Sequence, residues 1–263
     1  MSQKATYLDR ILEHHRALAG NDERSLADLM RRCEQMQTAR GFRDRLQMDA
    51  VQAIAVISEI KRKSPSKGLL RADLDPQFLA DAYQAGGASC LSVLTDEDFF
   101  AGSIEDLQIA AAACTLPVLR KDFTVSPHDV CDTRLMGADC VLLIAAALDP
   151  HELKDLHHLA TSIGLDVLVE IHDEAELEVA LFAEALLIGV NQRDLVTFEV
   201  DHRRALRMAE LIPSGVLRVA ESGVRGPADA LALHQAGYHA VLVGESLVTA
   251  DDPTRAVRAL RNL

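Results

Sequence analysis

Residues 137–150 read Gly-Ala-Asp-Cys-Val-Leu-Leu-Ile-Ala-Ala-Ala-Leu-Asp-Pro, and the pattern in this stretch decides the fold. The glycine is typical of a helix end, because it adopts a left-handed backbone without strain. The apolar run Val141–Ala145 does not alternate with polar residues, which is typical of a parallel strand buried on both faces. Asp149 and Pro150 then combine an N-cap residue with a proline in the first helical turn. The stretch therefore predicts a buried strand between two helices.

The same unit recurs along the chain. Apolar runs stand at Val56–Ile60, Cys90–Leu94, Val118–Arg120, Val141–Ala145, Val167–Ile171, Leu186–Val190, Val216–Ala220 and Ala240–Val243. Helix-start signals follow them, 23–28 residues apart, at Asp75, Ser103, Ser126, Asp149, Asp173, Asp201, Gly226 and Asp252. Eight strand–helix units predict an α/β fold, a single (β/α)8 or TIM barrel, over residues 54–263. The alternative is a doubly wound open sheet, which would more naturally carry a Gly-x-Gly-x-x-Gly turn that this chain lacks.

Residues 1–50 precede the first strand and predict an N-terminal helical extension. Apolar residues at helical spacing mark two helices, the first with Leu8, Ile11, Leu12 and His15 and the second with Leu26, Leu29 and Met30. The extension could close the bottom of the barrel or form a cap beside the active site, and the sequence leaves both open. No linker-like segment interrupts residues 54–263, so we expect residues 1–263 to form one domain.

Charge and cysteine content exclude several classes of function. The chain has 27 basic and 40 acidic residues, a net charge of −13, which disfavours binding to nucleic acid or to an anionic membrane. No apolar run reaches the roughly 18 residues that a membrane-spanning helix needs. The five cysteines form no Cys-x-x-Cys pair, so we expect reduced thiols in a cytoplasmic protein. The ten histidines lack metal-binding spacing, and we read His14, His15, His157 and His158 as solvent-exposed helix positions.

Polar residues follow the predicted strands where a barrel enzyme holds its active site, at the C-terminal ends. The candidate catalytic residues at these ends are Glu59, Lys61, Lys121, Glu170, Asn191 and Glu221. One such charge could be a solvated loop residue. Several charges converging on a barrel interior are different, because ionisable groups are seldom buried unless they are paired or functional. His172, which follows Glu170, could simply belong to the loop after the fifth strand.

Glycines and serines after the last two strands predict a phosphate site. Ser222-Gly223 and Gly244-Glu245-Ser246 lie where barrels commonly bind phosphate through backbone N–H groups, although ordinary turns would look the same. The run from Lys61 to Lys67 holds four basic residues and favours a flexible loop over an anionic substrate, with Ser64 and Lys67 near phosphate. No aromatic residue interleaves this run, which argues against nucleic acid.

The segment Ser58-Glu59-Ile60-Lys61-Arg62-Lys63-Ser64-Pro65-Ser66-Lys67-Gly68 resembles the signature of the indole-3-glycerol phosphate synthase family. The resemblance continues in order at Leu119–Phe123, Val169–Glu170, Gly189–Leu195, Glu221–Gly223 and Val243–Leu247. It implies ring closure, decarboxylation and dehydration of 1-(2-carboxyphenylamino)-1-deoxyribulose 5-phosphate to indole-3-glycerol phosphate, a step of tryptophan biosynthesis. It also implies a lyase that needs no metal or organic cofactor. We expect a monomer or a weak homodimer.

The resemblance also implies roles for individual residues. Lys121 matches the acid for ring closure, Glu170 an acid–base group of the later steps, and Lys61 a lysine near the substrate carboxylate. Positioning residues are Glu59, Asn191 and Glu221; phosphate-site positions are Ser64, Ser222, Gly223, Gly244, Glu245 and Ser246; the aromatic subsite has Phe100, Phe123, Leu142 and Arg193. Gln192 and Ala101 depart from the residues of many relatives. The alternatives are another phosphate-binding barrel, such as a phosphoribosyl isomerase, and an inactive barrel that only binds phosphorylated ligands.

The basic run in an acidic chain generates a prediction. If the charges from Lys61 to Lys67 attract an anionic substrate, kcat/KM should fall as ionic strength rises, because salt screens the field of the pocket. The measurement is kcat/KM over a series of salt concentrations at constant pH. A value that does not change with salt would contradict electrostatic attraction by this run.

Overall fold

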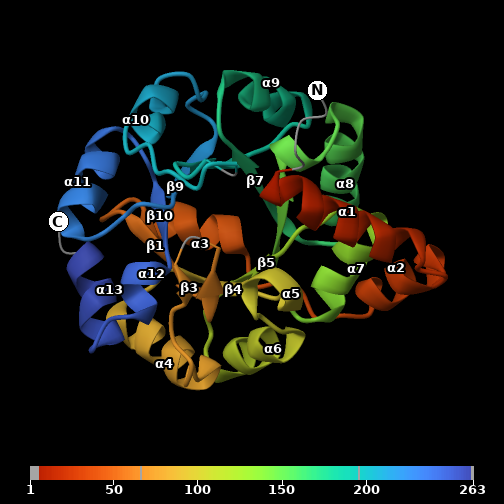
Figure 1. The fold of residues 1–263 in the computed structure, drawn as a ribbon, viewed down its shortest axis with the longest axis horizontal. Coiled ribbons are helices and arrows are strands. Elements are labelled where there is room, and N and C mark those ends of the chain that lie inside the picture. The colour runs from red at the N-terminus through yellow and green to blue at the C-terminus, as the bar shows by residue number, and fades with distance from the viewer. Residues whose placement is uncertain (1–5, 66, 195, 262–263) are drawn as a thin grey trace.

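The structure is a computed structural model and describes residues 6–65, 67–194 and 196–261. Ser66 and Leu195, which belong to the sequence motifs above, lie outside these described residues. Eight parallel strands close into a barrel with helices around it (Figure 1). In barrel order they are β1 (Ala55–Ile60), β10 (Ala240–Val243), β9 (Leu217–Glu221), β8 (Leu187–Asn191), β7 (Asp166–Ile171), β6 (Cys140–Ile144), β5 (Val118–Lys121) and β4 (Cys90–Leu94). The predicted (β/α)8 barrel is confirmed, and closure of β1 on both β4 and β10 excludes the open sheet.

Several strands differ by one residue from their predicted bounds. The runs expected at Val141–Ala145, Leu186–Val190 and Val216–Ala220 become β6, β8 and β9, each displaced by one position. Backbone pairing, rather than hydrophobicity, sets these ends. Asn191 and Glu221 are polar but still pair across β8 and β9, whereas Ala145 already belongs to a 3₁₀ turn.

The outer helices begin mostly where the sequence predicts. They are α4 (Pro76–Gly86), α6 (Ile104–Ala113), α7 (Pro127–Leu135), α8 (Pro150–Ser162), α9 (Glu174–Phe182), α10 (Arg204–Ala209), α11 (Pro227–Gln235) and α13 (Pro253–Arg261). The start predicted at Asp201 is wrong: its carboxylate accepts the Arg203 N–H in a preceding turn, so α10 begins later. Two short helices that were not expected, α5 (Glu97–Phe100) and α12 (Glu245–Val248), follow β4 and β10 directly. No helix among the described residues is long and apolar enough to cross a membrane.

The extension forms three helices rather than two, α1 (Tyr7–Gly20), α2 (Leu26–Glu34) and α3 (Phe42–Asp49) (Figure 1). Helix α3 closes the N-terminal end of the barrel, where Phe42 is fully buried and the backbone N–H of Arg43 donates to Asp166 at the start of β7. Helix α2 packs on α7. Helix α1 lies at the other end, where the Tyr7 ring contacts Phe99 beyond β4. The sequence left open whether the extension closes the barrel bottom or caps the active-site end. Helix α3 does the first, and helix α1 lies at the second.

His15 anchors helix α1, and the prediction that it is exposed to solvent is wrong. His15 is not exposed to solvent: its side chain is 13% exposed, and its Nε2 lies 2.9 Å from Asp96 Oδ2. His157 on α8 is also buried. His15 shares the apolar face of α1, but its partner Asp96 is distant in sequence, so the contact could not be predicted.

An ion pair at the bottom of the barrel ties the extension to the strands and generates a stability prediction. The buried Asp139 carboxylate accepts from the backbone N–H of Val118 at 2.8 Å and from Arg40 Nε at 2.8 Å. Arg40→Met leaves this carboxylate without its cation, so the free energy of unfolding should fall by about 3 kcal/mol. Urea unfolding of Arg43→Met is the control, because among the described residues the Arg43 side chain has one ion pair, with the exposed Asp44 at 3.7 Å, and the variant should lose less than about 1 kcal/mol. Equal losses in both variants would contradict the argument.

Candidate active site

A cavity of about 530 Å³ opens at the C-terminal ends of the barrel strands. Its volume suits a small organic molecule. All sixteen candidate residues line it: Glu59, Lys61, Ser64, Phe100, Lys121, Phe123, Leu142, Glu170, Asn191, Arg193, Glu221, Ser222, Gly223, Gly244, Glu245 and Ser246. The structure thus brings together residues from every part of the barrel, whereas their individual roles stay predictions.

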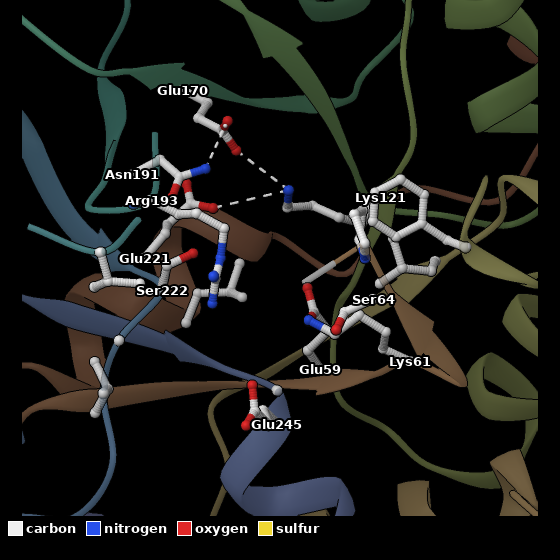
Figure 2. Close-up of a pocket in the computed structure, with 18 of the residues that line it drawn as sticks. Glu59, Lys61, Ser64, Lys121, Glu170, Asn191, Arg193, Glu221, Ser222 and Glu245 are labelled. Atoms are coloured by element: carbon white, nitrogen blue, oxygen red, sulfur yellow. Dashed lines mark hydrogen bonds and ion pairs between the residues drawn. The ribbon is translucent and has the colours of Figure 1, made fainter. Parts of the chain in front are cut away.

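Lys121 ends β5 and lies at the centre of the polar part of the cavity. Its Nζ is 3.2 Å from Glu170 Oε2 on β7 and 4.0 Å from Glu221 Oε2 on β9 (Figure 2). Asn191 at the end of β8 donates from Nδ2 to Glu170 Oε1 at 3.0 Å. One ammonium thus lies between two carboxylates, and an amide fixes the orientation of the nearer carboxylate.

Burial sets the protonation of these groups. Glu170 is 1% exposed, and although burial raises its pKa, the charges of Lys121 and His172 outweigh burial and lower the pKa to about 2. Burial and the charge of Glu170 raise the pKa of Glu221 well above its usual value. Burial lowers the pKa of Lys121, but the surrounding carboxylates raise it above its usual value. These directions favour a charged Lys121, an ionised Glu170 and a neutral Glu221 in the resting site.

The second pair, Glu59 and Lys61, comes from β1. The two residues are two positions apart, so both side chains face the barrel interior, where they form an ion pair. A Cβ atom on Gly244 would overlap Glu59 Oε1 and lie 3.1 Å from Lys61 Nζ. Gly189 on β8 makes room in the same way for Glu221 Oε1. Glycine at these two positions lets the carboxylates lie against neighbouring strands.

Apolar side chains form part of the cavity wall. The rings of Phe100 and Phe123 lie with centroids 6.1 Å apart, and Leu142 lines the same cavity. Phe100 belongs to α5, which Asp96 caps by accepting its backbone N–H at 3.1 Å. The wall can therefore contact an aromatic ring while the lysines face the polar end.

Two residues of the basic run after β1, Arg62 and Lys67, lie close to carboxylates that the sequence did not predict as their partners. Residues Lys63–Ser64 and Gly68–Leu69 form a small antiparallel hairpin, β2 and β3. Arg62 does not face the cavity, because its guanidinium binds Asp106 on α6 with an Nη2–Oδ1 distance of 2.7 Å. Lys67 Nζ lies 3.8 Å from Glu245. Of the four basic residues, only Lys61 lines the cavity. Fewer charges than expected are therefore placed to attract an anionic substrate.

Several cavity residues were missed by the sequence. They include Phe198, Val200 and His202 from the segment after β8, and Arg225 after β9. These positions follow strand ends, which is the only sequence signal that could have found them. Their loop conformation has no periodic pattern, and Phe198 has a positive φ of 60° that the sequence does not reveal.

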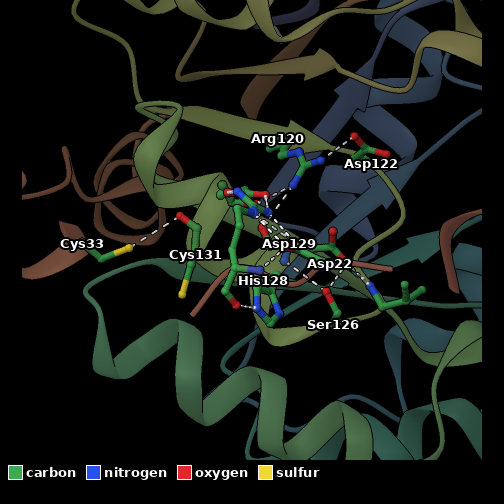
Figure 3. Close-up of polar contacts among 12 residues, drawn as sticks. Asp22, Cys33, Arg120, Asp122, Ser126, His128, Asp129 and Cys131 are labelled. Atoms are coloured by element: carbon green, nitrogen blue, oxygen red, sulfur yellow. Dashed lines mark hydrogen bonds and ion pairs between the residues drawn. The ribbon is translucent and has the colours of Figure 1, made fainter. Parts of the chain in front are cut away.

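The residues around Lys121 show which side chains could hold a metal. His15, Asp96 and Asp122 place ligand atoms within 4.8 Å of one another. However, Asp122 Oδ2 already accepts from Arg120 Nη2 at 2.9 Å (Figure 3). Arg120 itself points away from the cavity and donates to the backbone oxygen of Asp129. A cation would have to displace these bonds, so we describe the group as a junction between α1 and the ends of β4 and β5.

Fold and site together define a (β/α)8-barrel enzyme with lysines and carboxylates at the strand ends. The sequence profile described as "Indole-3-glycerol phosphate synthase" matches residues 8–260. The chain is 48% identical over 231 residues to the indole-3-glycerol phosphate synthase of Bordetella pertussis (strain Tohama I), which covers 88% of each chain. The chain belongs to the indole-3-glycerol phosphate synthase family. It is therefore a lyase of tryptophan biosynthesis, as its sequence motifs predicted.

Solved structures of lower identity share the fold alone. A 3-hexulose-6-phosphate synthase is 16% identical with a TM-score of 0.63 and covers 79% of this chain and 98% of its own. The N-acetylmannosamine-6-phosphate 2-epimerase of Clostridium perfringens is 14% identical with a TM-score of 0.59, over 76% of this chain and 90% of its own. At such identities these likenesses carry no argument about substrate.

The close approach at Gly244 generates a prediction. The sequence predicts a phosphate-site role for this residue, but a Cβ atom here would first meet Glu59 and Lys61. Gly244→Ala should therefore displace this ion pair and lower kcat by up to about 10²-fold, as small misplacements of catalytic groups do. Gly226→Ala is the matched control, because its Cβ would meet nothing within 4 Å. A Gly244→Ala enzyme with unchanged kcat and raised KM would instead favour phosphate exclusion.

Proposed function

We propose that this cavity converts 1-(2-carboxyphenylamino)-1-deoxyribulose 5-phosphate to indole-3-glycerol phosphate, with the roles below. The observation that carries the proposal is the Lys121 ammonium between the carboxylates of Glu170 and Glu221, in a cavity that Phe100 and Phe123 also line. Such a wall suits the carboxyphenyl ring, and the ammonium suits the ketone oxygen. The direct test is the appearance of indole fluorescence when the purified protein is mixed with this substrate.

Lys121 is the acid for ring closure. As the aromatic carbon attacks the ketone carbon, negative charge develops on the ketone oxygen, and the ammonium stabilises this charge and donates its proton. The carboxylates around Lys121 raise its pKa, so the amine is charged before the step. Lys61, paired with Glu59, would face the carboxylate that leaves as carbon dioxide and could supply a proton during dehydration.

Glu170 acts after ring closure. Once Lys121 has given up its proton, the carboxylate loses its nearest positive neighbour and becomes a stronger base. It can then take the proton whose removal forms the indole double bond, while the hydroxyl leaves as water. Asn191 holds the carboxylate at Oε1 and leaves Oε2 toward the cavity. Glu221, neutral in the resting site, can donate a hydrogen bond to a substrate oxygen.

The phosphate would bind at the side of the cavity formed by the segments after β9 and β10. Ser222 and Gly223 have positive φ angles of 64° and 73°, a turn that changes the direction of successive backbone N–H groups there. Ser246, Gly244 and Ser64 line the same cavity. Backbone donors of this kind bind phosphate without adding a titratable charge.

The chain's location and assembly are part of the proposal. We expect a cytoplasmic enzyme that is a monomer or a weak homodimer. All five cysteines are free and buried, which agrees with a reducing compartment. Analytical ultracentrifugation over a range of concentrations tests the oligomeric state.

The division of labour between Lys121 and Glu170 is the prediction of this mechanism. Lys121→Met should block the first bond-forming step, because it removes the proposed acid for the ketone oxygen. Glu170→Gln should leave carbon dioxide release fast but slow indole formation. Each loss should be about 10²–10⁴-fold.

Single-turnover kinetics that follow carbon dioxide and indole separately measure both effects. Substrate binding, measured by equilibrium titration, is the control, and both variants should retain it because phosphate binds elsewhere. Release of carbon dioxide at the wild-type rate by Lys121→Met would show that another group is the first acid. Equal slowing of both signals by Glu170→Gln would contradict a role confined to the later steps.

A further inference from the structure

His172 lies directly behind Glu170 and is not part of the cavity wall. It follows β7 by one residue, and its side chain is 11% exposed. Its Nδ1 lies 2.9 Å from Glu176 Oε2 on α9, and the same oxygen accepts the backbone N–H of His172 at 2.7 Å. These two bonds fix the ring in one orientation.

The other ring nitrogen points at the candidate catalytic carboxylate. His172 Nε2 is 3.8 Å from Glu170 Oε1, too far for a hydrogen bond but close enough for an ion pair. This nitrogen is fully buried and has no hydrogen-bond partner among the residues that the structure describes. A buried polar atom without a partner requires a physical explanation.

The arrangement favours the imidazolium form. With a carboxylate on each side, a neutral ring would donate from Nδ1 to Glu176 and present the Nε2 lone pair to Glu170, which is repulsive. A second proton on Nε2 replaces this repulsion with attraction. Accordingly, although burial lowers the pKa of His172, Glu176 and Glu170 raise it above its usual value.

We propose that His172 is a positioning residue that keeps Glu170 ionised after Lys121 has donated its proton. The proposal rests on the proposed role of Glu170. In the resting site Lys121 and His172 both stabilise the Glu170 carboxylate. During ring closure the Lys121 ammonium becomes a neutral amine, and its contribution disappears. His172 does not face the cavity, so it keeps its proton and remains the nearest cation to Glu170.

Without that cation Glu170 would be difficult to keep ionised. It is almost fully buried, and burial favours the protonated form. A protonated Glu170 cannot accept the proton that must leave during dehydration. His172 therefore matters most for the later steps and little for decarboxylation.

The charged groups that face His172 come from three elements. Glu170 on β7 and Glu176 on α9 raise the pKa of His172, and Arg204 on α10 lowers it. The Arg204 guanidinium already has a hydrogen-bond partner, because its Nη1 donates to the Asn191 backbone oxygen at 2.9 Å. The pH dependence of the site can therefore be altered from Glu176 without changing any residue that lines the cavity.

The experiment is single-turnover indole formation as a function of pH in His172→Gln. Glu170 has a lowered pKa, so in the wild type it loses its negative charge only as the pH falls far below neutrality. Without the histidine charge, protonation of Glu170 should begin at higher pH. The acidic limb of indole formation should move up by about one pH unit, a tenfold loss on that limb. At alkaline pH the variant should approach the wild-type rate, and carbon dioxide release should not change.

Two further variants separate charge from structure. Glu176→Gln keeps an acceptor for both His172 N–H groups but removes the charge that holds the ring protonated, so it should move the limb in the same direction by a smaller amount. Glu178→Gln changes an exposed carboxylate of the same helix and should leave the limb in place. Thermal unfolding of each variant shows whether it is folded.

Three outcomes would overturn the proposal: an acidic limb in folded His172→Gln at the wild-type position, a loss by the same factor at every pH, or equal slowing of carbon dioxide release. The role of Glu170 is tested separately by Glu170→Gln. If that variant retains the acidic limb, the limb does not belong to Glu170, and the proposed function of this residue fails rather than that of His172 alone.

Discussion

The site depends on one electrostatic constraint, the balance of charge inside the barrel. Two lysines, Lys61 and Lys121, face three carboxylates, Glu59, Glu170 and Glu221, so full ionisation would leave an uncompensated negative charge in a buried space. The raised pKa of Glu221 removes that charge by protonation. A neutral Glu221 also avoids repulsion of a substrate that carries both a carboxylate and a phosphate.

For this balance, the carboxylates of Glu59 and Glu221 must lie closer to neighbouring strands than a side chain on those strands would permit. Gly189 and Gly244 provide that space, because a Cβ atom at either position would overlap a glutamate oxygen. The sequence alone does not show why glycine stands at these two positions. The packing does, because each glycine leaves room for a glutamate side chain. Asn191 also orients the Glu170 carboxylate, and the pairing of β8 with β9 places Glu221 opposite Asn191.

Much of this could be predicted from the sequence, because the decisive signals are local. Apolar runs and N-cap residues gave the barrel, and strand ends identified the residues that line the cavity. Residues whose role depends on distant contacts could not be found: His15 looked like a solvent-exposed position and is held by Asp96, 81 residues away. Arg62 looked like part of a basic loop and is paired with Asp106. Charge patterns do not reveal which charges are already neutralised. Whether residues 1–263 form one domain stays a prediction.

The pairing of Lys61 and Lys121 with carboxylates assigns substrate binding and proton transfer to different groups. Each lysine of the cavity is already paired with a carboxylate, so neither offers a full free charge to an approaching anion. In a chain with a net charge of −13, backbone N–H groups, whose dipoles do not titrate, can attract phosphate together with the guanidinium of Arg193, which lines the same cavity. The titratable groups proposed to control proton transfer are Lys121, Glu170 and Glu221. Consequently, pH and substitutions at the carboxylates should act on kcat, whereas changes in the backbone of the turn after β9 should act on KM.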